Sequence, residues 1–312
     1  MPEVIEYSVV VPVYNCEASI LELHERITHT MEGLGNDYEI IFVDDCSEDG
    51  SWTVLKEFRK KDRRVKIIRL ARNFGQHNAT FCGLSHTRGS FIITLDDDLQ
   101  HPPEEIPRLI EKLSEGYSVV YARYKEKRHH ATENLFSQFF QVLIQRILEL
   151  PPGIFISSFS AMKQEVVAHL TTTKSHYIFL PALVARTVPA SRIANADVRH
   201  DERKFGRSNY TPFRYFRYAL SLLINHSALP LMGVAVLGIL VSILSFIYGI
   251  SIIARKLLDP SYGLVGWNSL MVTVTFIGGL LLMSTGIVGE YLRRILIEIS
   301  YSEPYIIGEK DV

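Results

Sequence analysis

Two long uncharged stretches near the end of this 312-residue chain constrain its folding more than any other feature. Residues 229–254 read LPLMGVAVLGILVSILSFIYGISIIA, and residues 267–289 also contain no Asp, Glu, Lys or Arg. Each stretch exceeds the roughly 18 apolar residues that a membrane-spanning helix requires. A core helix of a soluble protein would normally carry a polar stripe at this length, and neither stretch shows one. The sequence therefore predicts two transmembrane helices rather than two buried helices.

The connection between these stretches, residues 255–266, is too short for a domain, so the two helices are expected to form a hairpin. Positive charge marks the cytoplasmic side of a membrane protein. Cations on the side of the preceding domain outnumber those in the connection: Arg214, Arg217, Arg293 and Arg294 against Arg255 and Lys256. The chain begins without a signal-peptide pattern, and its three cysteines form no CxxC pair. We therefore expect an integral protein of the cytoplasmic membrane, with its N-terminal domain in the cytoplasm.

The chain divides into four expected parts: a domain over 1–210, a helix over 211–227, the hairpin over 228–290 and a cytoplasmic tail over 291–312. In the second part, apolar side chains recur at helical spacing beside two arginines. Such a helix suits the membrane interface, with its apolar face toward the lipid. The alternative is an ordinary amphipathic helix packed on the domain. The apolar positions are Phe213, Phe216, Leu220 and Leu223.

The N-terminal part alternates short apolar runs with amphipathic stretches, which is typical of an α/β fold. Strands are expected over 9–13, 39–43, 65–70, 91–95 and 118–121, and helices over 18–33, 51–61, 75–87 and 103–115. This order implies a mostly parallel, Rossmann-like sheet with helices on both faces. Ligands of such sheets bind beyond the carboxyl ends of the strands.

Polar or charged residues directly follow all five expected strands. Any one of them could cap the next helix, but five in succession favour a ligand site at one edge of the sheet. The formal net charge of −1 disfavours a protein that binds duplex nucleic acid. Neither GxxxxGK[ST] nor a GxGxxG after the first strand is present, which disfavours a P-loop and a dinucleotide site.

Three adjacent carboxylates, Asp96–Asp98, follow the fourth strand and would repel one another without a cation. Alternate residues of an extended segment face the same way, so Asp96 and Asp98 can share a site while Asp97 points away. Gln100 lies one step further along that face. Mg²⁺ and Mn²⁺ prefer oxygen ligands and keep open positions for phosphates. The sequence predicts such a metal beside a nucleotide, and the competing interpretation is a solvated acidic turn.

The motifs PVYN, VDDxSxDGS, RNFGQ and LDDDLQHPPEEIPRL resemble those of the family 2 glycosyltransferases, which have a GT-A fold. Within that family the chain is similar to the polyprenyl-phosphate glycosyltransferases with a C-terminal membrane hairpin. These include undecaprenyl-phosphate aminoarabinose transferases, bactoprenol glucosyltransferases and dolichol-phosphate mannose synthases. Residues 203–210 match the family pattern RxxGxSxY. The resemblance implies metal-dependent, inverting transfer of a sugar from a nucleotide-sugar, with UDP favoured over GDP, to polyprenyl phosphate.

The resemblance also implies roles for individual residues. Asp98, Arg123 and Arg203 are the expected catalytic residues, and Arg123, Arg203 and Ser208 are expected to meet the acceptor phosphate. The metal, Mg²⁺ or Mn²⁺, would be held by Asp96, Asp98 and Gln100. A homo-oligomer could form through the hairpin. The nucleotide-sugar is expected to contact Pro12, Tyr14, Asn15, Glu17, Asp44, Asp45, Arg72, Asp96 and Asp97.

One segment departs from the family pattern. Residues 154–163 read IFISSFSAMK, with no carboxylate and only Lys163 as a cation, where relatives often carry an Asp followed by an Arg. Because a phosphate acceptor hardly needs a general base, we interpret this as a change in substrate contacts. The alternative is a catalytically inactive relative that serves as a membrane partner of a flippase or a second transferase. A processive polysaccharide synthase is disfavoured, because neither Trp52 nor Trp267 follows an Arg.

Overall fold

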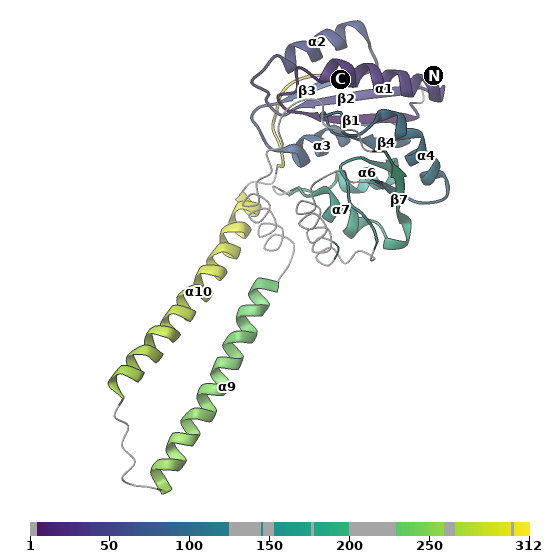
Figure 1. Ribbon diagram of the computed structural model, residues 1–312. Helices are drawn as coiled ribbons and strands as arrows, with labels where there is room; N and C mark the ends of the chain where they lie inside the picture. Colours follow the sequence, from purple (N-terminus) through teal and green to yellow (C-terminus); the bar gives the residue numbers. More distant parts are fainter. Residues whose placement is uncertain are drawn as a thin grey trace. The chain divides into compact units, whose positions relative to one another are not determined.

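The computed structural model describes residues 5–124, 145, 153–175, 178–199, 229–258, 266–300 and 303–312. The chain forms two compact units (Figure 1). The first contains residues 1–209 together with 301–312, and the second contains residues 210–300.

The first unit is built on an eight-stranded sheet with the order β7-β5-β6-β4-β1-β2-β3-β8. β1 pairs in parallel with β2 and β4, β2 pairs in parallel with β3, and β5 pairs in parallel with β7. β6 and β8 run antiparallel to their neighbours. The bounds are β1 (Tyr7–Val13), β2 (Tyr38–Asp44), β3 (Val65–Leu70), β4 (Phe91–Thr94), β5 (Val119–Tyr124), β6 (Ser160–Lys163), β7 (Ile193–Val198) and β8 (Ile307–Asp311).

Helices cover both faces of this sheet, as the alternating pattern predicts. One face packs against α1 (Ile20–Leu34), α2 (Ser51–Lys61) and α4 (Ile106–Ser114), and a short 3₁₀ turn, η1 (Pro103–Glu105), precedes α4. The other face packs against α3 (Gln76–Leu84), α6 (Gln164–Leu170) and α7 (Leu180–Thr187). A second 3₁₀ turn, η2 (Ala190–Arg192), leads into β7. The predicted α/β fold with a mostly parallel sheet is therefore confirmed.

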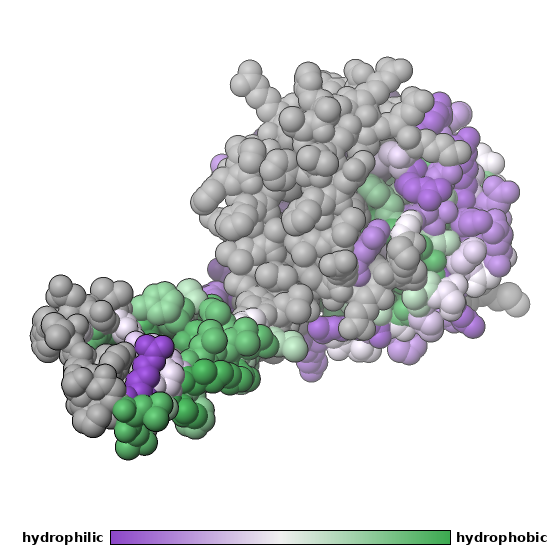
Figure 2. Space-filling model, turned by 60° about the horizontal axis from the view of Figure 1, so that its bottom comes forward, coloured by the Kyte–Doolittle hydropathy of each residue, from purple (hydrophilic) through white to green (hydrophobic). Residues whose placement is uncertain are grey.

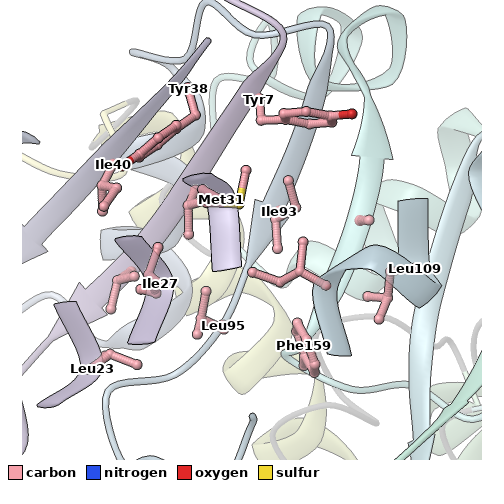
Figure 3. Close-up of a cluster of buried hydrophobic side chains, with 14 of the residues drawn as sticks. Tyr7, Leu23, Ile27, Met31, Tyr38, Ile40, Ile93, Leu95, Leu109 and Phe159 are labelled. Carbon is pink, nitrogen blue, oxygen red and sulfur yellow. The ribbon is translucent and has the colours of Figure 1, made fainter. Parts of the chain in front are cut away.

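The core lies between these layers and explains why the strands read as unbroken apolar runs. Every residue of β1 and β2 is buried, because both faces of a parallel sheet are covered. Val9 and Val11 belong to the cluster under α1, whereas Val10 belongs to the cluster under α3. Figure 3 shows side chains of α1, including Leu23 and Ile27, directed toward strand residues. Successive side chains of β1 thus point to opposite faces of the sheet and contribute to both clusters.

The described residues of the expected tail, 291–312, contain regular secondary structure. Residues 291–300 continue a long helix, and Ile307–Asp311 form β8, which pairs with β3. The backbone N–H of Ala71 donates to the carbonyl of Ile306 (2.8 Å), and Trp52 Nε1 donates to Glu309 Oε2 (3.3 Å). The sequence of β8, IGEKD, lacks the apolar pattern of an inner strand, and among its residues only Ile307 is partly buried. An edge strand needs only a backbone partner, and β8 covers the otherwise open edge of β3.

The second unit contains two long helices, α9 (Leu229–Leu258) and α10 (Trp267–Ser300). Leu231–Tyr248 in α9 has a mean hydropathy of 2.5 with none of this window buried, and is long and apolar enough to cross a membrane. Figure 2 shows hydrophobic side chains gathered over the described residues of these helices. The transmembrane hairpin and its orientation stay predictions. The expected interface helix, 211–227, lies outside the described residues.

Candidate active site

The loops that follow β1 and β2 are joined by side-chain to backbone hydrogen bonds. The backbone N–H of Asn15 donates to Ser47 Oγ (3.0 Å), and the N–H of Gly50 donates to Glu17 Oε2 (2.9 Å). In return, the N–H of Glu17 donates to Asp49 Oδ2 (3.0 Å). The parallel pairing of β1 and β2 brings these loops to the same edge of the sheet. The predicted Asn15 and Glu17 therefore lie together at the carboxyl end, with Tyr14 half exposed beside them.

Asp44 and Asp45, at the end of β2, are both engaged within the protein. Asp44 is fully buried and accepts an ion-pair contact from Arg69 Nε (3.1 Å). Asp45 accepts hydrogen bonds from the backbone N–H groups of Phe74 (2.7 Å) and Gly75 (2.8 Å). Burial raises the pKa of both carboxyls. Asp45 thus fixes the loop that carries the RNFGQ motif, a contact that the sequence does not reveal.

The three carboxylates after β4 have three different environments. Asp96 accepts from Gln76 Nε2 on Oδ1 (2.5 Å) and from Ser158 Oγ on Oδ2 (2.6 Å). Asp97 Oδ2 accepts from the backbone N–H of Tyr14 (3.0 Å), which joins this loop to the end of β1. Asp98 Oδ1 accepts from the N–H of Gln100 (3.1 Å). Each of the three carboxylates thus has its own partners, and the shared site of Asp96 and Asp98 stays a prediction.

The carboxylates of this turn lie close together in a partly buried environment, which raises the pKa of two of them. Burial raises the pKa of Asp96, and the charge of Asp98 raises it further. Burial is also the main reason that the pKa of Asp97 is raised to about 6. The His101 ring lies beside this turn, with its Nδ1 3.8 Å from Asp96 Oδ2. A bound cation would relieve the repulsion among these carboxylates.

The donor set fits a hard divalent cation shared with a ligand. Within the described residues, no three His, Cys, Asp or Glu side chains surround one point. Asp96, Asp98 and Gln100 offer two carboxylates and an amide oxygen on one short turn. Mg²⁺ is commonly held by one or two carboxylates together with substrate phosphates rather than by a cage made only of protein. These residues therefore suit a metal that is completed by a phosphate-bearing substrate.

The segment that lacks a carboxylate, 154–163, supplies hydroxyl groups to the same edge. Ser158 Oγ donates to Asp96, and Thr94 Oγ1 donates to the carbonyl of Ser158 (2.7 Å). Ser157 Oγ lies 3.1 Å from the hydroxyl of Tyr124. Sequence reasoning missed Ser158, because its partner Asp96 is 62 residues away in the chain. The segment that departs from the expected pattern therefore contacts the acidic turn through Ser158.

Left-handed backbone conformations mark the same loops. The described residues contain three non-glycine residues with positive φ: Asn15 at 52°, Cys46 at 60° and Leu99 at 60°. Each follows a different strand, β1, β2 or β4, at its carboxyl end. Such conformations cost free energy and persist where the surrounding structure enforces them, often at functional sites. They single out the same edge of the sheet as the polar side chains do.

Some of the remaining predicted site residues lie within the described part of the chain, and others do not. Arg123 Nε donates to Asp197 Oδ1 (2.7 Å), and the side chain of Arg123 is exposed. The Arg72 guanidinium lies over the Phe74 ring, 4.8 Å from its centroid. Pro12 is buried within β1. Arg203 and Ser208 lie outside the described residues.

The sequence profile described as Glycosyl transferase family 2 matches residues 8–171, which contain all the loops described above. The undecaprenyl-phosphate 4-deoxy-4-formamido-L-arabinose transferase of Klebsiella pneumoniae (strain 342) is 33% identical over 308 residues, covering 98% of this chain and 94% of that protein. The chain belongs to glycosyltransferase family 2. A second relative, from Bacillus subtilis (strain 168), is named uncharacterized glycosyltransferase YkcC. It is 35% identical over 304 residues, covering 97% of this chain and 93% of that protein.

Solved structures of glucosyl-3-phosphoglycerate synthase from Mycobacterium tuberculosis share the fold. The complex with phosphoglyceric acid has a TM-score of 0.53 at 19% identity, covering 72% of this chain and 80% of that one. The complex with Mn²⁺, UDP-glucose and phosphoglyceric acid has a TM-score of 0.51 at 20% identity, covering 71% and 79%. This family 2 chain is therefore a glycosyltransferase with a GT-A fold.

Proposed function

We propose that this glycosyltransferase moves a sugar from a nucleotide-sugar, with UDP as the favoured nucleotide, to undecaprenyl or another polyprenyl phosphate. The main support is the similarity, along nearly the full chain, to a transferase named for undecaprenyl phosphate. The acidic turn with Asp96 and Asp98 supports the same function. The solved relative with Mn²⁺ and UDP-glucose supports the donor class and a divalent metal.

The reaction needs little acid–base chemistry from the protein. A phosphate oxygen of the acceptor attacks the anomeric carbon, the bond from that carbon to the nucleoside diphosphate breaks, and the electron pair leaves with the diphosphate. Bound Mg²⁺ or Mn²⁺ would neutralise charge that develops on the leaving group. The acceptor phosphate is already an anion, so no carboxylate base is needed to activate it. The carboxylate-free segment 154–163 is consistent with this chemistry.

The protein's part is then to align the two phosphate-bearing substrates. Asp96, Asp98 and Gln100 would hold the metal, and Gln76 and Ser158 would hold Asp96 in place. The loops with Tyr14, Asn15 and Glu17 would receive the nucleotide, beside the RNFG loop fixed by Asp45. We assign Arg123, with Arg203 and Ser208, to the acceptor phosphate, because a guanidinium can grip two phosphate oxygens at once.

We also propose that the reaction takes place at the cytoplasmic face of the membrane. The apolar window Leu231–Tyr248 and the uncharged first part of α10 support a membrane hairpin. The excess of arginines on the domain side supports the orientation. A polyprenyl phosphate has its tail in the bilayer, so an enzyme anchored there meets its acceptor by diffusion in two dimensions.

The test uses the full chain, purified in detergent, with undecaprenyl phosphate and a panel of UDP- and GDP-sugars. Mg²⁺, Mn²⁺ and EDTA are compared, and glycolipid formation is followed by mass spectrometry. We expect one donor to yield a glycolipid in a reaction that EDTA stops. Nucleotide binding without product from any donor would instead favour the inactive membrane partner, which the carboxylate-free segment alone suggests.

Ser158→Ala should weaken this reaction through Asp96. Loss of a hydrogen bond to a charged group costs about 1.5–3 kcal/mol, so we expect the metal concentration at half-maximal rate to rise roughly tenfold or more. Ser114→Ala is the matched control, because among the described residues its hydroxyl donates to the Ile110 carbonyl within α4 (3.0 Å) and not to the acidic turn. Titration of Mn²⁺ at saturating donor separates the two variants. An unchanged metal requirement in Ser158→Ala would show that Ser158 has no positioning role.

A further inference from the structure

A cavity of about 470 Å³ lies at the edge of the sheet opposite to the acidic turn. It opens beside the amino end of β3, where Ile67 pairs with Asp311 of β8. Figure 1 shows the C-terminal end of the chain next to β3 and α2. We call this cavity the basic pocket, since five of its seven lining residues are cations: Arg59, Lys60, Arg63, Lys66 and Arg88, with Asp311 and Val312 completing the lining.

The charges of the basic pocket do not balance within the protein. Arg59 Nε forms an ion pair with Asp311 Oδ1 (2.9 Å), and Lys66 pairs with the buried carboxylate of Glu39. In the described part of the chain, the side chains of Lys60, Arg63 and Arg88 have no ion-pair partner. Within the described residues, three positive side chains therefore converge on one concavity with no carboxylate side chain paired to them.

Internal hydrogen bonds and ion pairs hold the backbone around these cations in place. Glu39, 1% exposed, accepts from the backbone N–H of Arg88 on Oε1 (2.7 Å) and also holds the Lys66 ammonium. Arg59 Nη1 donates to the carbonyl of Arg63 (2.9 Å). The backbones at Arg63 and Arg88 are thus fixed by internal contacts, while their side chains remain exposed. A site whose charged groups are positioned in advance binds its ligand at a lower entropic cost.

Helix electrostatics explain only part of this arrangement. The carboxyl end of a helix attracts cations, which accounts for the basic last turn of α2. Arg63 and Arg88 lie outside α2, and they approach the pocket from the connections before β3 and β4. Like charges brought together in a concave site repel one another unless an anion is present.

We propose that the basic pocket binds an anion with two or more phosphate groups, at a site separate from Asp96 and Asp98. Arginine side chains bind phosphate through paired N–H donors, and lysine adds a point charge. The cavity volume falls within the range of about 300–1,000 Å³ that is usual for small-molecule sites. Apart from Val312 its lining is charged, which favours an anionic ligand over an apolar one.

The test is calorimetric titration of tripolyphosphate into the full chain in detergent, without divalent cations. We expect the double variant Arg63→Gln/Arg88→Gln to raise the Kd about tenfold or more. The control Lys61→Gln/Arg186→Gln removes the same charge from exposed residues outside the pocket and should change the Kd less than about twofold. Asp98→Asn should keep the wild-type affinity, because it alters the opposite edge of the sheet.

Two further arms identify the source of the phosphate groups. The titration is repeated in phosphatidylcholine nanodiscs with and without cardiolipin, a lipid whose headgroup carries two phosphates. Equal affinities support a soluble phosphate compound, whereas competition by cardiolipin that Arg63→Gln/Arg88→Gln abolishes supports a lipid headgroup. The proposal is wrong if the pocket pair and the control pair behave alike, or if wild-type protein does not bind tripolyphosphate.

Discussion

Asp98→Asn is expected to reduce glycosyl transfer by about 10²-fold or more, since removal of one preorganised electrostatic contact to a reacting group commonly costs that much. Asp98 and Asp96 lie on one turn, and the neutral amide would weaken the hold on the metal and on the donor diphosphate. The measurement is kcat with undecaprenyl phosphate, over a Mn²⁺ titration.

The same substitution should leave the protein folded. Without metal, Asp98 adds to the repulsion that raises the pKa of Asp96. Removal of this charge should keep or raise the Tm of the metal-free protein while activity falls. Glu111→Gln is the control, because Glu111 is an exposed carboxylate on α4. Activity within twofold of wild type in Asp98→Asn would remove Asp98 from the catalytic residues.

Glu39→Gln is expected to lower the free energy of unfolding by about 3–5 kcal/mol, since it leaves a buried ammonium without its counter-charge. Glu39 accepts from Ser8 Oγ (2.6 Å) and from the N–H of Arg88, and pairs with Lys66, which is 7% exposed. The glutamine could keep one of these contacts to neutral donors but not the ion pair. Urea denaturation of the full chain in detergent measures the change.

The double variant Glu39→Gln/Lys66→Met provides the matched comparison. Replacement of both ions removes the uncompensated charge, so the double variant should recover much of the stability that Glu39→Gln loses. A double variant no more stable than Glu39→Gln would mean that the ion pair contributes little and that the hydrogen bonds of Glu39 to Ser8 and Arg88 dominate.

The sheet and its first helices could be predicted because their signals are local. An inner strand such as β2 must be apolar along its length, and an amphipathic helix such as α1 repeats its buried residues at helical spacing. The polar loops could be assigned to one edge because the carboxyl ends of parallel strands meet there. Both inferences need no knowledge of contacts between distant residues.

The missed features depend on contacts between distant parts of the chain. β8 pairs with β3 across more than two hundred residues, and its exposed side chains give no apolar signal. The hydrogen bond from Ser158 to Asp96 and the hold of Asp45 on the RNFGQ loop likewise join separate segments. A serine or an aspartate in a loop has many possible partners, and only the fold selects one.

The return of β8 to the sheet imposes an order on biosynthesis. The ribosome makes β3 early, but the strand that covers its edge is translated only after both helices of the second unit. Until then, the nascent domain carries an open strand edge of the kind that pairs with other chains. Completion of the domain is therefore coupled to synthesis of the apolar helices, and a chain that stops after residue 300 would keep that edge exposed.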